Sequence, residues 1–556
     1  MKRTALILMV LAFLETIGMA GLACAERIIS GTITDPWGRP ASGYLIKAWD
    51  EDTGSKNDFM GQAHTDPQGR YTMRPYEKKH WDTALPGSDK WRPDIFIEVY
   101  AKIKDQWVKV KQSKTYSDRK HTEDTRIDLQ LTGIMGKILY EGKKPAGNVL
   151  VKAYDEDDIV GGKRDFMNQA YTDSQGQYFI LYGAKHWDTA AHGVTAWRPD
   201  IFIEVHDTIR GRMIKVNKQS KIYKDHPIRD NLAIDQIILP KEYMNYSVPK
   251  LQGNSLNVLA YNIKMFQHIP NIDVKVDLGQ SGPDRYPLIA NQIMKEDYDV
   301  IVLAEAFDVI REKLIKHLGY PYRTRIVGKD MKLSHGHITN GGVIILSRWP
   351  IENGDGEQRL FGKDICSNDE DLDCMADKGV IYARIKKNAY KYHVFGTHTD
   401  AGKSSGDVYA RKKQFGIIRK FIDEKILSNE IKPNELVIIA GDLNVDRYDK
   451  NYADSAEYID MLKELNAVHP SLVGYRFSSD QNVNDFLPNA GKRQLFDYVL
   501  VSNSSQARLR HSYNKVLFYR ADKEWRCYMW KKAKYKFFWD ISDHYPVLGY
   551  FEMPPN

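Results

Sequence analysis

The sequence predicts two all-β sandwich modules followed by a layered α/β domain, and three features of the 556-residue chain support this prediction. A long segment that includes Lys47 is repeated in the segment that includes Lys152. Both copies consist of short β-prone runs separated by turn residues, as in β-sandwiches. From about Ser255, apolar strand-like runs alternate with helical patterns, which indicates an α/β fold. We expect a leader over 1–25 and domains over 26–131, 132–243 and 250–556.

The first 25 residues have the features of a secretory signal. Lys2 and Arg3 precede an apolar run, and Ala23-Cys24-Ala25 offers small residues to a signal peptidase. Cys24 also permits a lipoprotein, in which it would be acylated. No later segment reaches the ~18 to 20 apolar residues needed to cross a bilayer. We therefore expect an exported chain, secreted or periplasmic.

Net charge and cysteine usage exclude few kinds of substrate or functional site. The formal charge of +7 suits an anionic substrate or a membrane surface without selecting either. Cys366 and Cys374 enclose a short acidic loop, and in an oxidising compartment we expect them to form a disulfide. Cys527 is left over, and no cysteine–histidine spacing indicates a zinc site.

The repeat is close at the level of single residues. The segment Trp91–Val99 returns unaltered as Trp197–Val205, and each copy has a turn such as Asp66-Pro67-Gln68-Gly69. These patterns resemble the transthyretin-like extracellular domains over Glu26–Leu239. The resemblance implies modules that bind or position rather than catalyse, with a ligand that the sequence does not identify. The acidic triplets that begin at Asp50 and Asp155 are either calcium ligands or, as we favour, solvated strand ends.

In the α/β domain, polar residues follow the ends of the expected strands. Leu436–Ala440 is apolar throughout, as in a strand buried on both faces, and Gly441 is expected to turn the chain sharply and present Asp442 and Asn444. Other strand ends supply Asn262, Glu305, His398, Asp497, Asp543 and His544. We expect strands at 257–261, 300–303, 342–347, 392–395, 436–440 and 498–501, and helices at 287–295 and 409–426.

Each of these polar residues alone has a structural explanation, but together they offer what hydrolysis of a phosphodiester requires. Glutamate and amide oxygens suit Mg²⁺, a hard ion that takes one or two carboxylates. A histidine held by a carboxylate can accept a proton from water at neutral pH. A second histidine and an Asp/Asn pair can stabilise charge and orient water. No serine or cysteine nucleophile motif competes.

The order of these motifs resembles the endonuclease/exonuclease/phosphatase superfamily, which includes deoxyribonuclease I. The motifs are Tyr261-Asn262, Ala304–Phe307, Gly396–Thr399, Gly441–Asn444 and Ser542–Val547. The fold implied is a four-layer α/β sandwich. The segments Asn340–Ile351, Asp377–Tyr382 and His393–Thr399 are similar to secreted bacterial neutral sphingomyelinase C, which implies release of phosphocholine and ceramide from sphingomyelin.

The same resemblance implies roles for the site residues. Glu305 would be the main ligand of Mg²⁺, or of Mn²⁺ or Co²⁺, with Asn262 near it. His544 would be the general base, held by Asp497, with Asp543 near the metal.

Three further residues complete the implied mechanism. His398 would stabilise the phosphate or act as an acid, while Asp442 and Asn444 would orient water and phosphate. Water would attack phosphorus in line, without a covalent intermediate. The acidic loop 352–374 and the short insert 404–408 depart from the sphingomyelinase pattern and bear on headgroup choice.

An aromatic, lysine-rich stretch precedes the last motif. Its candidate membrane-docking residues are Trp525, Trp530, Phe537, Phe538 and Trp539. Such a stretch suits a lipid interface, a single-stranded nucleic acid, or a hairpin packed on the core. We favour the lipid interface, as in neutral sphingomyelinases. The leading prediction is thus an exported, Mg²⁺-dependent sphingomyelin phosphodiesterase; the alternatives are an exported nuclease of DNA or RNA and an adhesion protein with a vestigial domain.

Overall fold

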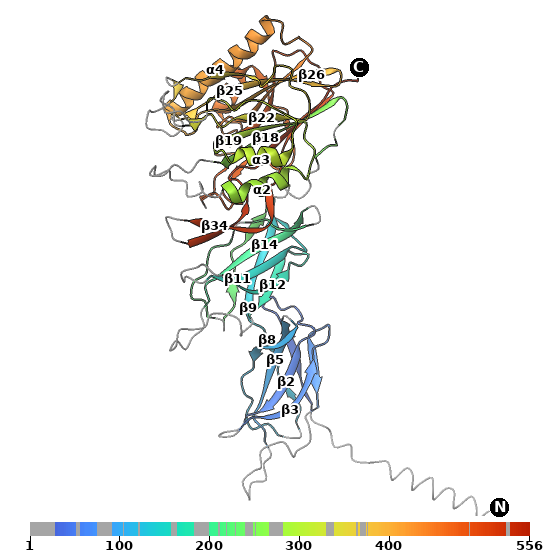
Figure 1. Ribbon diagram of the computed structural model, residues 1–556. Coiled ribbons are helices and arrows are strands. Elements are labelled where there is room, and N and C mark those ends of the chain that lie inside the picture. Colours follow the sequence, from blue (N-terminus) through green and yellow to red (C-terminus); the bar gives the residue numbers. More distant parts are fainter. Residues whose placement is uncertain are drawn as a thin grey trace, which may run out of the picture.

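The computed structural model shows an elongated molecule with a β-module at one end, a second in the middle and an α/β domain at the other end (Figure 1). It describes residues 28–555 except 52–55, 75–91, 104, 121–122, 157–163, 183–198, 210–211, 218, 228–229, 240–247, 251, 266–281, 330–338, 363–364, 367–373, 375, 489 and 530–533. The predicted leader and Trp530 lie outside the described residues. None of the helices in the described ranges has the length and apolarity to cross a membrane.

Module 1, the predicted domain over 26–131, is a sandwich of two small sheets. One sheet has the order β4(Arg70–Met73), β1(Ile29–Thr34), β7(Thr125–Arg126), with β8(Leu129–Gln130) also paired to β1. The other has the order β3(Asp58–His64), β2(Leu45–Asp50), β5(Ile95–Ile103), β6(Gln106–Gln112). Alternate residues of β1 are buried, as expected for a strand with one face on the core.

Module 2, the predicted domain over 132–243, repeats this architecture. Its sheets have the orders β10(Lys144–Pro145), β9(Gly133–Tyr140), β13(Gln177–Leu181), with β16(Leu232–Ala233) and β17(Ile237–Leu239) on β9, and β12(Arg164–Tyr171), β11(Leu150–Glu156), β14(Ile201–Ile209), β15(Arg212–Lys215). Leu45 pairs with Tyr100 in module 1, and Leu150 pairs with His206 in module 2. The corresponding strands β2 and β11 have a register irregularity at the same place, before Trp49 in β2 and before Tyr154 in β11. The duplication is therefore present in the structure as well as in the sequence.

The acidic strand ends have structural partners. Oδ1 of buried Asp50 accepts a hydrogen bond from the backbone N–H of Asp94 (2.7 Å), and Oδ1 of Asp155 accepts one from Asp200 N–H (2.8 Å). These contacts give the first aspartate of each triplet a role in turn geometry. They differ from the solvated strand ends that we expected, because both side chains are buried.

The α/β domain contains two facing sheets. The first has the order β20(Tyr322–Arg323), β22(Ile344–Ser347), β19(Val300–Ala306), β18(Ser255–Met265), β36(Val547–Glu552), β33(His511–Val516), β29(Ser471–Leu472). The second has the order β23(Glu357–Leu360), β25(Gly379–Lys387), β26(Tyr390–His398), β27(Leu436–Asp442), β32(Asp497–Ser502), β28(Ala467–Val468). Short pairs β21(Thr339–Asn340)–β24(Ala376–Asp377) and β30(Ser479–Asp480)–β31(Arg493–Gln494) lie apart from them.

Helices cover the outer faces of both sheets and give the predicted four layers. Helices α2(Gly282–Ile293) and α3(Arg311–Leu318) lie beside the first sheet, and α4(Ser405–Leu427) and α5(Ala456–Leu465) beside the second (Figure 1). All six predicted strands and both predicted helices are present. Helix α4 begins earlier than the apolar pattern indicated, because Ser404 and Asp407 form a capping box.

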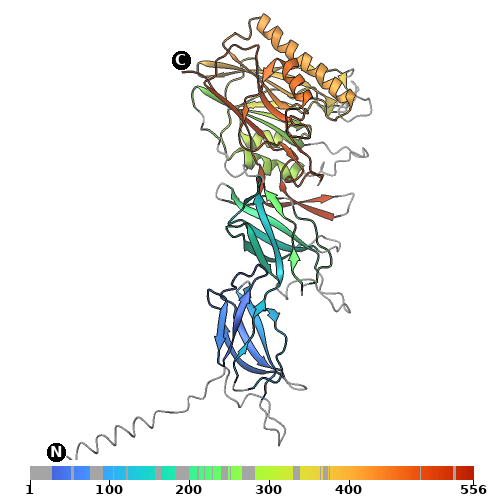
Figure 2. The ribbon, with the colours of Figure 1, turned by 180° about the vertical axis from the view of Figure 1, so that it is seen from behind.

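The aromatic stretch forms the hairpin β34(Arg520–Met529)–β35(Lys534–Asp540), which lies between module 2 and the α/β domain (Figure 2). Most buried hydrophobic residues in the described part of the chain belong to one of two clusters. One belongs to module 1, with Leu181 of module 2 at its edge. The other runs from Ile134 to Met553 and joins module 2 to the α/β domain. Module 2 and the α/β domain thus share one core.

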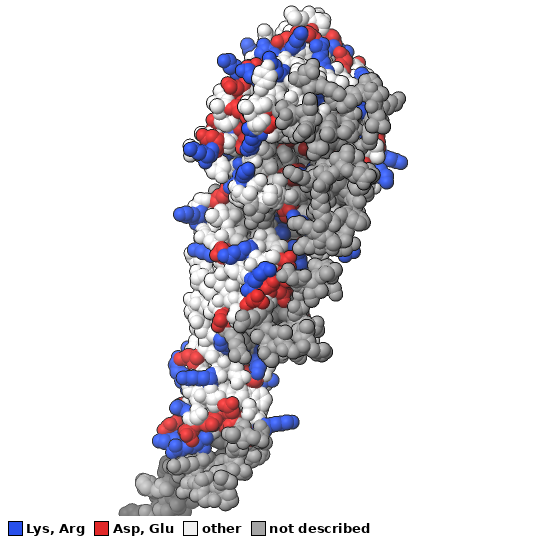
Figure 3. Space-filling model, turned by 90° about the vertical axis from the view of Figure 1, so that its left-hand side faces the viewer, with Lys and Arg blue, Asp and Glu red and all other residues white. Residues whose placement is uncertain are grey.

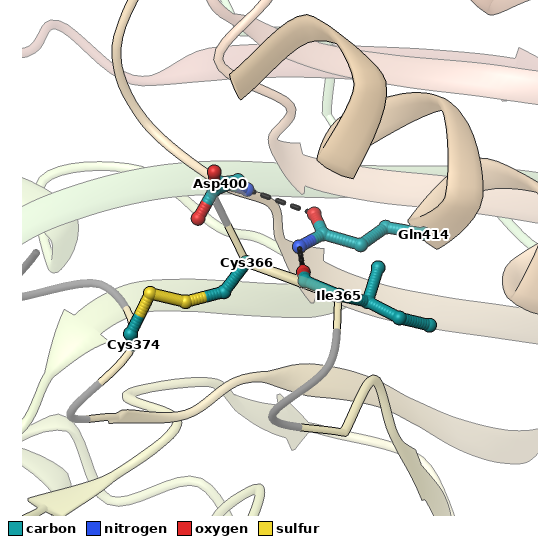
Figure 4. The surroundings of a disulfide bond; sticks show 5 residues. All are labelled: Ile365, Cys366, Cys374, Asp400 and Gln414. Atoms are coloured by element: carbon teal, nitrogen blue, oxygen red, sulfur yellow. Dashed lines mark hydrogen bonds between the residues drawn. A yellow bond between two sulfur atoms is a disulfide. The ribbon is translucent and has the colours of Figure 1, made fainter. Parts of the chain in front are cut away.

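Cys366 and Cys374 form a disulfide beside the second sheet (Figure 4). Gln414 of α4 accepts a hydrogen bond from Asp400 N–H (2.9 Å) and donates one to the carbonyl of Ile365 (3.2 Å). Gln414 of the long helix therefore links the residue before Cys366 to the segment that follows β26.

Candidate active site

Three neighbouring strands of the second sheet bring the polar strand ends together. β26 and β27 are parallel, with His398 opposite Asp442, and β27 and β32 are antiparallel, with Asp442 opposite Asp497. In the facing sheet, β18 and β19 are parallel and carry Asn262 and Glu305. The carboxyl ends of parallel strands meet at one edge of a sheet, so the residues gather in one place.

Gly441 is required for a reason other than the expected turn. The strand continues through Asp442, but Gly441 has φ +145°, and a Cβ there would lie 1.9 Å from the carbonyl oxygen of Thr397. The glycine allows β26 and β27 to approach closely. That approach sets Asp442 next to His398, with 3.9 Å between His398 Nε2 and Asp442 Oδ2.

His544 is held by Asp497. Its Nδ1 lies 2.7 Å from Asp497 Oδ2 and 3.8 Å from Asp442 Oδ2, and the ring of Phe496 stacks on the imidazole. Burial by itself would lower the pKa of His544, but the carboxylates of Asp497 and Asp442 outweigh it and raise the pKa well above its usual value. The contact fixes the ring and leaves Nε2 as the nitrogen that can exchange a proton.

Asp442 and Asn444 are oriented by backbone and amide contacts. Asp442 accepts hydrogen bonds from the N–H of Asn444 (2.9 Å) and from Asn262 Nδ2 (2.9 Å), and Asn444 Nδ2 donates to the carbonyl of Thr399 (3.0 Å). Burial, and next the charge of Asp497, raise the pKa of Asp442 to about 7. The cluster thus concentrates negative charge that a cation would relieve.

Glu305 offers the place for that cation. It has a left-handed backbone (φ +53°), and its Oε2 is buried without a hydrogen-bond partner among the described residues. Ligand atoms of Glu305, His398 and Asp442 lie within 4.8 Å of one another, as do those of Asp442, Asp497 and His544. An orphaned buried carboxylate oxygen beside further oxygen and nitrogen donors fits a hard divalent ion.

Asn262 lies beside Glu305, as expected, and contacts its carboxylate through the amide nitrogen. Its Nδ2 donates to Glu305 Oε1 (2.8 Å), while its amide oxygen accepts from the N–H of Lys264 (3.1 Å). The amide therefore braces two carboxylates from different sheets, and its oxygen is turned to the backbone rather than offered as a ligand.

The sequence reasoning overlooked Lys264 and Arg285. Lys264 Nζ forms an ion pair with Asp543 inside the site. Arg285 of α2 donates to the carbonyls of Ile263 (3.0 Å) and Ile541 (2.8 Å), which ties β18 to the segment before Asp543. A charged residue two positions after Asn262, in an otherwise apolar run, was the available signal for Lys264.

The expected membrane-docking surface is wrong for two of its residues. Phe538 is only 1% exposed and Trp539 only 8% exposed. Trp539 packs edge-on against His206 of module 2, and Phe538 contacts Phe486 and Trp525. Both rings are therefore buried by protein contacts, Trp539 against module 2 and Phe538 within the α/β domain.

The two remaining described candidates for membrane docking, Phe537 and Trp525, also have protein neighbours. Phe537 lies under the guanidinium of Arg164, which is paired with Glu524 of the hairpin (3.0 Å). Trp525 is half-buried and its Nε1 donates to the carbonyl of Asp540 (3.0 Å). The third reading of this stretch, a hairpin packed on the core, describes it best.

A family model described as "Endonuclease/Exonuclease/phosphatase family" matches residues 259–544, just over half of the chain. The chain belongs to this family. The matched segment begins in β18 and ends at His544, so every residue of the cluster, from Asn262 onward, lies within the family domain.

Relatives in the family are similar to the α/β domain. Sphingomyelinase C 2 of Leptospira interrogans is 34% identical over 342 residues, which cover 57% of this chain and 50% of that protein. Sphingomyelinase C of Listeria ivanovii is 32% identical over 318 residues and 86% of its length, and that of Bacillus cereus is 32% identical over 323 residues and 90% of its length. The chain spans about half the length of the Leptospira relative.

Solved structures also match. The crystal structure of SmcL has 29% identity and a TM-score of 0.45, covering 54% of this chain and 100% of its own. A Staphylococcus aureus beta toxin variant with bound magnesium ions has 27% identity and a TM-score of 0.44, covering 53% and 99%.

Proposed function

We propose that this protein is an exported, divalent-metal-dependent phosphodiesterase that hydrolyses sphingomyelin to ceramide and phosphocholine. One observation carries the proposal: His544, held by Asp497, lies beside the carboxylate of Asp442, which in turn lies within 4.8 Å of a ligand atom of Glu305, in a domain similar to sphingomyelinases C over most of their length. The two β-modules, which we propose to be transthyretin-like, would position this domain at its substrate surface.

The residues divide the work as follows. Glu305 would hold Mg²⁺, with Asn262 bracing its carboxylate, and the ion would supply positive charge for the phosphoryl oxygens. Asp442 and Asn444 orient the attacking water. The carboxylates of Asp497 and Asp442 keep the imidazole of His544 protonated without a cation, and the charge of a bound ion would lower the pKa of His544, so that Nε2, oriented by Asp497, can accept the proton. His398 stands on the other side of Asp442 and stabilises the phosphoryl charge or protonates the leaving oxygen.

A nuclease of the same fold would need a basic surface continuous with the site. On the face shown in Figure 3, the described Lys and Arg residues are interspersed with Asp and Glu. The described residues of this face therefore offer a polyanion no continuous basic surface. Nucleic acid is therefore an arm of the test rather than a second proposal.

The test is hydrolysis by purified protein, with Mg²⁺ or EDTA, of sphingomyelin vesicles, phosphatidylcholine vesicles, DNA and RNA. We expect phosphocholine release from sphingomyelin with Mg²⁺ only, and its loss in His544→Ala. His511→Ala, which removes an exposed histidine of β33, is the matched control. Cleavage of nucleic acid without lipid hydrolysis would overturn the proposal.

A further inference from the structure

Lys264 occupies an unusual backbone position at the edge of the site. It has φ +46°, a left-handed conformation that a lysine adopts at a cost. Its N–H donates to Asn262 Oδ1 (3.1 Å), and its carbonyl accepts a hydrogen bond from Arg285. Both contacts hold the backbone in this state. Residues held in such conformations cluster at functional sites.

The side chain of Lys264 ends at a carboxylate of the site. Its Nζ pairs with Asp543 Oδ2, and the two side chains are 19% and 13% exposed. The site therefore contains a largely buried ammonium–carboxylate pair.

This pair bears on how many ions the site can take. Two-metal phosphodiester sites hold two cations about 3.5–4 Å apart, each needing carboxylate oxygens. Within the described residues, the groups able to hold an ion draw on Glu305, His398, Asp442, Asp497 and His544, and Asp543 belongs to neither group. Asp543 is already paired with Lys264, whose positive charge would repel a dication at the same place.

We propose that Lys264 takes the place of a second divalent cation beside Asp543, so that the site binds a single ion. The inference deepens the proposed function and rests on it, since it takes Glu305 as the ligand of that ion. Lys264 supplies a permanent positive charge where a two-ion site would need a second metal, and it keeps Asp543 out of the coordination sphere.

The test counts bound Mn²⁺ on the full chain without lipid, by calorimetric titration and by the loss of the free-ion electron paramagnetic resonance signal. We expect one ion on the parent protein and on Lys264→Arg. In Lys264→Met, the uncovered Asp543 should admit a second ion or tighten binding about tenfold, because a repelling charge is gone. Lys264→Met/Asp543→Asn, which removes both charges, should return to one ion.

Two further outcomes keep the inference open to disproof. Two ions on the parent, or an unchanged number and affinity in folded Lys264→Met, would overturn it and leave the proposed phosphodiesterase activity standing. If Lys264→Met does not fold, Asp543→Asn decides: the count must stay at one, and loss of an ion would show that Asp543 is a ligand. No bound ion on the parent would overturn the metal-dependent function as well.

Discussion

The indole of Trp539 packs edge-on against the imidazole of His206, with ring centroids 5.4 Å apart, and so joins the hairpin of the α/β domain to module 2. Trp539→Ala should lower the free energy of unfolding by about 3–5 kcal/mol, because a large buried ring is lost. Chemical denaturation measures the effect. Trp107→Ala, at a 41% exposed indole of module 1, should change stability by less than about 0.5 kcal/mol. Trp539→Ala with unchanged stability but lost vesicle binding would restore the docking role.

Asp497→Asn should reduce kcat by about 10²–10⁴-fold, because the amide no longer selects the tautomer and orientation of His544 that leave Nε2 free to accept a proton. Steady-state hydrolysis of sphingomyelin vesicles measures the loss, and circular dichroism checks the fold. Asp460→Asn, on the exposed face of α5, should keep the parent rate. Retention of activity in Asp497→Asn would mean that another group activates the water.

Glu305→Gln should abolish stabilisation by Mg²⁺. At a concentration 100 times Kd, a bound ion stabilises the folded state by about 2.7 kcal/mol, so Tm should rise for the parent and not for the variant. Without metal the variant should be the more stable of the two, since burial and Asp543 disfavour the charge of Glu305 and raise its pKa. Differential scanning fluorimetry with Mg²⁺ or EDTA measures both effects, with Glu123→Gln as an exposed control. An equal Mg²⁺ shift in Glu305→Gln would place the ion elsewhere.

Deleting residues 28–131 should leave a folded, active protein, because the buried hydrophobic residues of module 1 form their own cluster. Deletion through residue 247 should instead destabilise the α/β domain. That cut exposes Trp539 and removes the module 2 carbonyl, at Lys215, that accepts a hydrogen bond from buried Arg520. Calorimetry of the two truncated chains distinguishes these outcomes. If the chain truncated through residue 247 were as stable and active as the chain that lacks only 28–131, module 2 would be dispensable.

Glu524 should make stability fall as pH rises. Burial, and next the charge of Glu204, raise its pKa from 4.5 to about 7, so the folded chain retains a proton that the unfolded chain releases. The contribution of Glu524 to the free energy of unfolding is therefore fully present below about pH 4.5 and is lost as the pH rises to about 7. Glu524→Gln should exceed the parent in Tm at pH 8, with the difference shrinking toward pH 4. A difference independent of pH would contradict the assigned pKa.

The sequence predicted the architecture because the relevant signals are local. Apolar runs such as Leu436–Ala440 and the period of the repeat report burial and duplication without knowledge of contacts, and every expected strand and helix of the α/β domain is present. The cluster of Glu305, Asp442, Asp497 and His544 was also predictable, because the carboxyl ends of parallel strands and the amino ends of the antiparallel strands beside them meet at the same edge of a sheet.

Contacts between segments that are far apart in the chain could not be predicted from the sequence. An aromatic, lysine-rich stretch has the same composition whether its rings face lipid or protein. Only the tertiary contacts, of Trp539 with module 2 and of Phe538 with Phe486 and Trp525, decide that these two rings are buried. In the same way, an asparagine and a lysine near Glu305 have no fixed role until the chain folds. The tertiary structure turns the amide nitrogen of Asn262 toward two carboxylates and brings Lys264 to Asp543, because both partners come from strands and loops far away in the chain.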